Sequence, residues 1–269
     1  MFIRDLFEQK KVVYSFELFP PKPTSPIDTL YRALDELKEL SPDYISITYG
    51  TGAGMGEGTL NLCRLIKQKY GIEPLSHLTC IHSDKQSILE YLKELEKSGI
   101  ENILALRGDI KPGLPLSEDF KYASELIEFI RRHGNFGISA ACYPEGHFEA
   151  PDIVTDIKNL KKKVDAGAQH LNTQLFFDNE DFYRFMDMVR LAGIEVPIQA
   201  GVMPLVKRKQ IERIIGLTGV KIPAKISRML AKFGDNDVAL FDAGIAYATE
   251  QIIDLFSYGV RGIHLYIMN

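Results

Sequence analysis

The sequence is poor in cysteine, and no apolar run reaches the roughly 20 residues needed to span a bilayer. Its three cysteines, Cys63, Cys80 and Cys142, are widely spaced and form no Cys-x-x-Cys pair, which fits a reducing cytosol and argues against a zinc cluster. The amino terminus mixes acids into an amphipathic helical pattern and lacks the basic-then-apolar order of a signal peptide. We therefore expect a soluble, cytoplasmic protein without a metal site.

An excess of positive charge is also missing. Lys and Arg number 32 against 36 Asp and Glu, which gives a net charge of −4 at pH 7. No broad cationic surface for nucleic acid or an anionic membrane is therefore implied, whereas small polar or anionic ligands stay open. The hydrophobic content of 45% supports a large core, and 269 residues suit one α/β barrel, which needs about 250. We expect a single domain over residues 1–269.

Nucleotide-binding glycine motifs are absent as well. Glycine occupies every other position from Gly50 to Gly58, which indicates a loop. This loop contains neither the Gly-x-Gly-x-x-Gly spacing of dinucleotide-binding folds nor the Gly-x-x-x-x-Gly-Lys-Ser/Thr pattern that cradles phosphates. A Rossmann domain and a P-loop both lack their sequence signal.

Apolar runs of strand length alternate with helical patterns along the chain. Strands are predicted at 12–19, 44–49, 74–80, 102–107, 137–143, 170–177, 196–202 and 262–268. Helices are predicted at 26–40, from about 59, at 84–98, 118–132, 151–166 and 179–192, and over 207–257 with breaks at Pro223 and near Gly234. Eight strands alternating with helices favour a (β/α)8 TIM barrel over a doubly wound sheet, which would need a glycine fingerprint or a switch-point site.

The first predicted strand contains one carboxylate, Glu17, inside an otherwise apolar run that ends at Pro20 and Pro21. Because two prolines forbid further ladder hydrogen bonds, Glu17 is expected near the carboxyl end of a buried strand. Ionising a carboxylate in apolar surroundings is costly, so such a group tends to keep its proton and becomes a candidate general acid. The alternative is a structural ion pair with Arg or Lys.

In a TIM barrel, chemistry collects where strands end and loops begin. Polar groups occur consistently at these places: Glu17, Thr48, His77, Arg107, Asp109, Tyr143, Glu145, His147, Gln174 and, after the seventh strand, Gln210. His77 and His82 have no neighbouring cysteine or carboxylate cluster, so histidines satisfied by backbone groups are favoured over a metal site.

A lysine run, Lys158 and Lys161 to Lys163, lies on the predicted helix over 151–166 together with Asp156 and Asn159. A solvated outer face explains such a run most simply. The alternative is a site for a diphosphate, because lysine supplies a point charge to phosphate and Asn159 could bond a ribose or phosphate oxygen.

Seven motifs follow one another along the chain: Ser15-Phe16-Glu17-Leu18-Phe19-Pro20-Pro21, Thr48-Tyr49-Gly50, His77-Leu78-Thr79-Cys80, Leu106-Arg107-Gly108-Asp109, Tyr143-Pro144-Glu145-x-His147, Lys163-Val164-Asp165-Ala166-Gly167-Ala168 and Thr173-Gln174-x-Phe176-Phe177-Asp178. In sequence and order they resemble the methylenetetrahydrofolate reductase family, flavoproteins that make 5-methyltetrahydrofolate. Each motif alone is weak, but seven in one order over almost the whole chain are specific. The resemblance implies an FAD-dependent oxidoreductase of one-carbon metabolism and methionine biosynthesis.

The resemblance also implies roles for individual residues. Glu17 would protonate the folate so that its five-membered ring opens to an iminium. Asp109 would tune the flavin and help to bind folate, and Gln174 and Gln210 would contact folate or nicotinamide. The positions that match the FAD site are Thr48, Tyr49, His77, Arg107, Gly108, Asp109, Tyr122, Ala123, Tyr143, His147, Ala150, Asp156, Asn159, Lys162 and Lys163. Hydride transfer would be ping-pong, from NADH or NADPH to FAD and then to methylenetetrahydrofolate, without a Rossmann domain.

Two departures from the family pattern limit this implication. Ile214 stands where some members place a phenylalanine that packs against nicotinamide or folate, which leaves the electron donor open. The chain also stops at Asn269, whereas the family continues with a basic residue and the helix that closes the barrel. We therefore expect the barrel to lack its final helix, so that Ile263, Leu265 and Ile267 would face water unless another segment or subunit covers them.

Three assemblies or functions fit the sequence. The first is a flavin reductase that forms a homo-oligomer or a hetero-complex with an electron-transfer subunit. The second is a non-catalytic or electron-accepting subunit of a larger folate-reducing complex. The third is a flavin-free, pterin-binding methyltransferase barrel. Colour distinguishes them, because a flavoprotein is yellow and bleaches when it is reduced.

Overall fold

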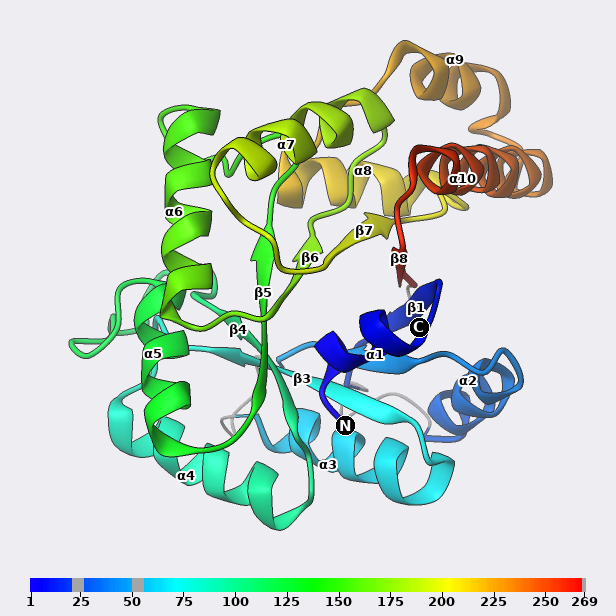
Figure 1. Cartoon of the computed structure of the whole chain (residues 1–269). Coiled ribbons are helices and arrows are strands. Elements are labelled where there is room, and N and C mark those ends of the chain that lie inside the picture. Colours follow the sequence, from blue (N-terminus) through cyan, green and yellow to red (C-terminus); the bar gives the residue numbers. More distant parts are fainter. Residues whose placement is uncertain (21–26, 50–55, 268–269) are drawn as a thin grey trace.

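Eight parallel strands close into a barrel in chain order, with β1 paired to both β2 and β8 (Figure 1). The structure is a computed structural model and describes residues 1–20, 27–49 and 56–267. The strands are β1 (Val13–Leu18), β2 (Tyr44–Ile47), β3 (Glu73–Thr79), β4 (Asn102–Leu106), β5 (Gly137–Cys142), β6 (His170–Thr173), β7 (Ile198–Val202) and β8 (Gly262–Tyr266). The predicted TIM barrel is confirmed. The parts of the predicted elements that fall on 21–26, 50–55 and 268–269 lie outside the described residues.

All eight predicted strands are present, and only the sixth differs from its predicted bounds by more than two residues. β6 ends at Thr173, whereas the prediction extended it to Phe177. The apolar residues that follow belong to helix packing instead: Leu175 and Phe177 join a second hydrophobic cluster with Met203 and Leu240. A continuous apolar run is compatible with either role, so the sequence could not separate them.

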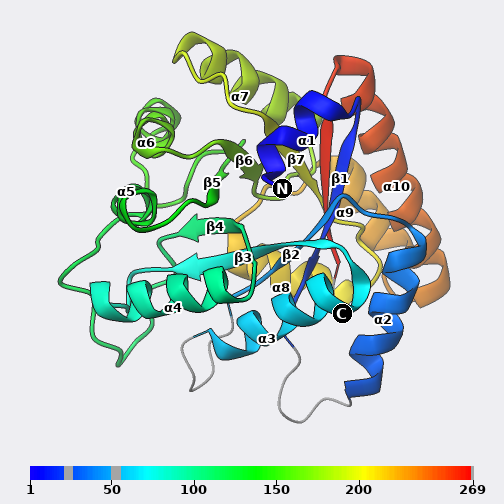
Figure 2. The same cartoon turned by 60° about the horizontal axis from the view of Figure 1, so that its bottom comes forward.

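Helices cover the outside of the barrel (Figure 2). They are α1 (Ile3–Gln9), α2 (Ile27–Glu39), α3 (Glu57–Leu65) with the π-helical turn η1 (Ile66–Tyr70), α4 (Lys85–Lys97), α5 (Ala123–His133), α6 (Ile153–Ala166), α7 (Asn179–Leu191), α8 (Arg208–Thr218), α9 (Ala224–Phe233) and α10 (Asp237–Tyr258). The breaks predicted at Pro223 and near Gly234 are confirmed. Helix α5 begins five residues later than predicted because the Glu125 carboxylate accepts hydrogen bonds from the backbone N–H groups of Lys121 and Tyr122.

Helix α1 closes the amino-terminal end of the barrel. Ile3, Leu6 and Phe7 are all buried there, where they pack into one cluster with inward side chains of the strands that include Val13, Tyr44, Leu75 and Leu104. Burial of apolar area is worth about 25 cal/mol per Å², so this short helix fastens the chain start to the barrel. The opposite, carboxyl-terminal end is left for polar side chains.

The eighth strand is better covered than predicted. Ile263 is only 2% exposed, because Ala248 and Leu255 of α10 pack in the same cluster. The expectation that Ile263 would face water is therefore wrong, while Leu265 and Ile267 are half-buried. In the described part of the chain, no helix is both long enough and apolar enough to cross a membrane.

Candidate active site

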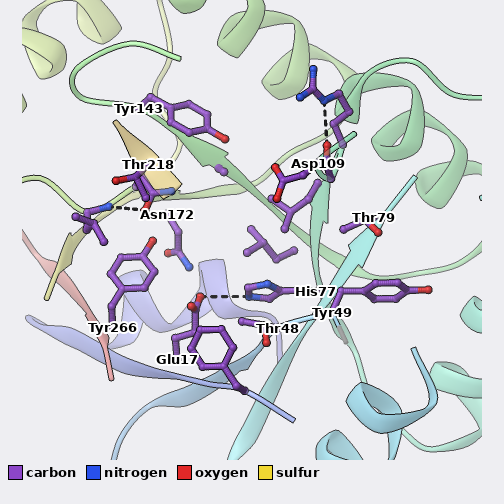
Figure 3. Close-up of a pocket in the computed structure, with 18 of the residues that line it drawn as sticks. Glu17, Thr48, Tyr49, His77, Thr79, Asp109, Tyr143, Asn172, Thr218 and Tyr266 are labelled. Carbon is purple, nitrogen blue, oxygen red and sulfur yellow. Dashed lines mark hydrogen bonds and ion pairs between the residues drawn. The ribbon is translucent and has the colours of Figure 1, made fainter. Parts of the chain in front are cut away.

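A cavity of about 800 Å³ opens at the carboxyl ends of the strands (Figure 3). Its wall contains most of the predicted site residues: Glu17, Thr48, Tyr49, His77, Arg107, Gly108, Asp109, Tyr143, His147 and Gln174. They come from six strands or the loops that follow them, because parallel strands bring all their carboxyl ends to one side of a closed barrel. The residue types at the strand ends provide the polar groups, and closure of the barrel brings these groups together.

Glu17 lies at the floor of this cavity between two buried histidines. Its Oε2 is 3.7 Å from Nε2 of His77 on β3 and 3.7 Å from Nε2 of His264 on β8. Burial lowers the pKa of His77 to about 4, although the nearby Glu17 carboxylate opposes this shift. His77 is therefore neutral at pH 7, so its contact with Glu17 is no permanent ion pair. The alternative of a structural pair with Arg or Lys finds no such partner among the described residues.

The two histidines singled out in the sequence have different surroundings. His82 is satisfied by backbone groups, as predicted: Nδ1 lies 2.8 Å from Pro115 O, and Nε2 accepts from the backbone N–H of Lys111 at 3.2 Å. His77 instead contacts side chains, since its Nε2 also hydrogen-bonds to Ser46 Oγ. The prediction of a backbone-satisfied histidine is wrong for His77, because β3 turns its side chain into the barrel.

His264 was not recognised as a site residue from the sequence. It is 1% exposed and paired in register with Ser15 across the β1–β8 seam. The available signal was the alternation of the last strand, which turns His264 and Tyr266 inward and Ile263 and Leu265 outward. That pattern could have placed His264 on the barrel interior, but not beside Glu17.

The loop after β4 brings its backbone close to the cavity. Gly108 has φ +85°, and a Cβ there would lie 2.9 Å from Cβ of Thr79, so the position requires glycine. The neighbouring Asp109 is exposed on the rim. The Arg107 guanidinium binds both oxygens of Glu149, and this hydrogen bonding raises the pKa of Arg107. Glu149 was not predicted, because it has no strand-end or motif signal.

A second cavity of about 410 Å³ adjoins the first and shares the wall formed by Arg107, Tyr143 and His147. The remaining predicted cofactor positions line it: Tyr122, Ala123, Ala150, Asp156, Asn159, Lys162 and Lys163. All fifteen positions that matched the family's FAD site thus lie on one of two adjoining cavities. A smaller cavity of about 270 Å³ contains Glu145, whose pKa burial raises.

The lysine run divides between two environments. Lys162 and Lys163 line the second cavity, whereas Lys161 pairs with Asp165 one turn along α6 and Lys158 is exposed. Lys163 Nζ donates to the Ala141 carbonyl at 2.6 Å, and burial lowers its pKa. Half of the run is a solvated face and half belongs to a cavity.

The two predicted glutamines also lie in different places. Gln174 is on the wall of the main cavity, where its Oε1 accepts from Leu175 N at 2.9 Å. Gln210 does not line any of the three cavities described; it points back to its own loop, with Oε1 3.4 Å from Val206 N. Ile214, one turn further along α8, does reach the wall of the main cavity.

Comparisons with known proteins identify the family of this chain. The sequence profile described as "Methylenetetrahydrofolate reductase" matches residues 2–269. The chain belongs to this family. It is 37% identical over 261 residues to the 5,10-methylenetetrahydrofolate reductase of Escherichia coli (strain K12), which covers 97% of this chain and 88% of the relative. Members of the methylenetetrahydrofolate reductase family are oxidoreductases of folate one-carbon metabolism.

Relatives occur in plants as well. "Methylenetetrahydrofolate reductase (NADH) 1" of Arabidopsis thaliana is 36% identical over 282 residues, covering 99% of this chain and 48% of the relative. Among solved structures, a Clostridium thermocellum protein described as binding two copies of 5-methyl-5,6,7,8-tetrahydrofolic acid superposes with a TM-score of 0.64 over 99% of this chain and 92% of its own. At 12% identity, that likeness concerns the fold alone.

Proposed function

We propose that this chain reduces 5,10-methylenetetrahydrofolate to 5-methyltetrahydrofolate, with FAD as the hydride carrier and a reduced nicotinamide as the donor. Family membership supports the folate reduction itself. The observation that carries the finer proposal is a nearly buried carboxyl group, Glu17, at the floor of a cavity of about 800 Å³ that adjoins a second, lysine-lined cavity. A carboxyl group and a lysine-lined cavity thus lie side by side, which supports an acid step next to an anionic cofactor.

The residues present fit an FAD molecule. Lys162 and Lys163 supply positive charge for a diphosphate, and Asn159 beside them supplies an amide for a ribose or phosphate oxygen. Gly108 lies on the wall of the main cavity, and because any Cβ there would collide with Thr79, the backbone itself forms this part of the wall. When bound, FAD supplies the chemistry of accepting a hydride from nicotinamide and passing it to the folate.

Glu17 performs the acid step of the proposed reaction. Its proton goes to the ring nitrogen that leaves, and the bond from that nitrogen to the methylene carbon breaks with its electron pair staying on nitrogen. The methylene carbon becomes an iminium on the other nitrogen and can then accept a hydride. Asp109 and Gln174 face the same cavity and would orient the pterin through hydrogen bonds.

Two half-reactions test the proposal. Purified protein is titrated with FAD, reduced anaerobically with NADH or NADPH, and then mixed with methylenetetrahydrofolate in a stopped-flow instrument. We expect FAD to bind, its absorbance to bleach with at least one donor, and its oxidised spectrum to return on adding the folate. Protein that binds no FAD would favour the methyltransferase alternative, and bound FAD that no nicotinamide reduces would favour a subunit fed by a partner.

A further inference from the structure

A buried polar layer fills the barrel directly beneath Glu17. Ser15, Tyr44, His170, Gln199 and His264 point inward from five strands, and each is at most 1% exposed. Buried polar groups are costly unless they are hydrogen-bonded. In the described structure these five side chains form a connected set of hydrogen bonds, so the layer has a defined arrangement.

The orientation of Gln199 determines the direction of these bonds. One of its amide atoms lies 2.8 Å from the carbonyl oxygen of Ile263, and a carbonyl only accepts, so that atom is the NH2 group. The amide oxygen consequently faces the other way, 2.8 Å from Tyr44 Oη and 3.2 Å from His170 Nε2. The same NH2 group donates a second hydrogen bond to Ser15 Oγ at 2.8 Å.

The hydrogen bond between Ser15 and His264 determines which ring nitrogen of His264 carries the hydrogen. Ser15 Oγ accepts from Gln199 at 2.8 Å and lies 2.7 Å from His264 Nδ1. Ser15 is fully buried, so its hydroxyl proton needs an acceptor, and the NH2 group of Gln199 cannot be one; we therefore assign this proton to the bond with His264 Nδ1. A ring nitrogen that accepts a hydrogen bond carries no hydrogen, so the neutral ring has its N–H at Nε2. Nε2 is the atom that faces Glu17 Oε2 at 3.7 Å.

We propose that His264 is a positioning residue for the acid Glu17. Gln199 and Ser15 hold the imidazole in the tautomer whose Nε2–H points at Oε2 of the carboxyl group, which leaves Oε1 to present the proton to substrate. The 3.7 Å separation is longer than a hydrogen bond, and such contacts commonly shorten when a substrate binds. The inference rests on the proposed acid role of Glu17 and adds the group that orients it.

The other neighbours of the carboxyl group differ from His264. His77 Nε2 is shared between Glu17 and Ser46 Oγ, so its ring is fixed by a hydroxyl on the same atom. Tyr266 donates its hydroxyl proton to the Thr173 carbonyl at 2.7 Å and so is occupied elsewhere. The Nε2–H of His264 therefore has the clearest assignment as a donor toward Glu17.

A pair of matched substitutions tests this role. The amide NH2 of glutamine can take the place of Nε2–H, whereas that of asparagine reaches only the place of Nδ1. We expect His264→Asn to slow the reaction of reduced enzyme with folate by about 10- to 100-fold, and His264→Gln to recover much of that loss. Reduction of bound FAD by nicotinamide should be unchanged in both. Ser15→Ala, which leaves the ring in place but frees its tautomer, should give a smaller loss in the folate step.

The same experiment separates the two proposals. FAD affinity and the melting temperature of each variant report on folding. If His264→Gln and His264→Asn slow the folate step equally, or slow both half-reactions together, the positioning role is wrong while the acid role stands. If Glu17→Gln leaves the folate step intact, the acid role itself fails, and the positioning role fails with it.

Discussion

The two ends of the barrel are built from the same strands but serve opposite purposes. On β1 the inward residues run from Val13 through Ser15 to Glu17, and on β3 from Leu75 to His77. At the amino-terminal end these side chains are apolar and pack on α1, whereas at the carboxyl-terminal end they are polar and face a cavity. Two to four positions along a strand thus separate a side chain that stabilises the fold from one that faces the cavity.

The largest expected effect on activity comes from a substitution of Glu17, at the carboxyl-terminal end of the barrel. Glu17→Gln keeps the shape but removes the acid, so we expect the folate half-reaction to fall by about 10²- to 10⁴-fold while nicotinamide still reduces the flavin. Stopped-flow absorbance of each half-reaction measures the split, and thermal unfolding should be nearly unchanged. Equal losses in both half-reactions would contradict the assignment.

The opposite end should respond in stability. Phe7 of α1 is 6% exposed, and its ring centroid lies 5.4 Å from that of His170. Phe7→Ala should lower the free energy of unfolding by about 3 kcal/mol because it removes apolar burial and leaves a cavity. Denaturant unfolding tests this, and Leu40→Ala, at a residue that is 56% exposed, is the control with little expected change. Folate turnover by the folded variant should persist; its selective loss would contradict the division between ends.

Buried neutral histidines make the barrel interior sensitive to acid. Burial lowers the pKa of His77 to about 4 and that of His170 to about 3. Between these values and the unfolded pKa near 6.5, the unfolded chain binds more protons, so stability is full above pH 6.5 and falls as pH falls. Each histidine contributes a slope of up to about 1 kcal/mol per pH unit.

Unfolding measured from pH 7.5 to 5 should show this slope, and His170→Gln should flatten it even if that variant starts less stable. The exposed His133, changed in the same way, serves as the control. Parallel slopes for wild type and His170→Gln would show that this residue does not cause the acid sensitivity.

The lysine run offers a comparison within one helix. Replacing Lys162 and Lys163 together with alanine should weaken FAD binding by about tenfold or more, because hydrogen bonds between charged groups and phosphate are strong. Because added salt screens charge, the difference in FAD affinity between the wild type and this variant should become smaller as the salt concentration rises. The matched control replaces Lys158 and Lys161 on the other part of the helix. Unchanged affinity in the first variant would show that Lys162 and Lys163 do not bind the FAD diphosphate.

The smallest expected effect concerns Glu149. Its carboxylate occupies the guanidinium of Arg107 between the two cavities, and the partly exposed pair is worth little. Glu149→Gln should weaken this pair and free positive charge, so FAD should bind about two- to fivefold more tightly. Fluorescence titration measures the change. Weaker binding would mean instead that Glu149 orients Arg107 for the cofactor.

Much of the fold followed from local pattern. The apolar run over 12–19 and the prolines behind it predicted the first strand and placed Glu17 near its end, and Pro223 and Gly234 marked the helix breaks. The sixth strand was predicted too long, because Leu175 and Phe177 are apolar for a different packing reason. The site was predicted through strand ends and motifs, and its residues gather on two adjoining cavities except for Gln210, which points back to its own loop, and Glu145, which lines a third cavity.

The period of each element and the chemical type of each strand end could be read from the sequence, because both depend on neighbours along the chain. Contacts between distant groups depend on the tertiary structure. Closure of β1 on β8 brings His264 to Glu17 and Ser15, and the loop that contains Glu149 folds back on Arg107. Barrel closure and side-chain direction depend on all eight strands at once, so no local pattern contains them.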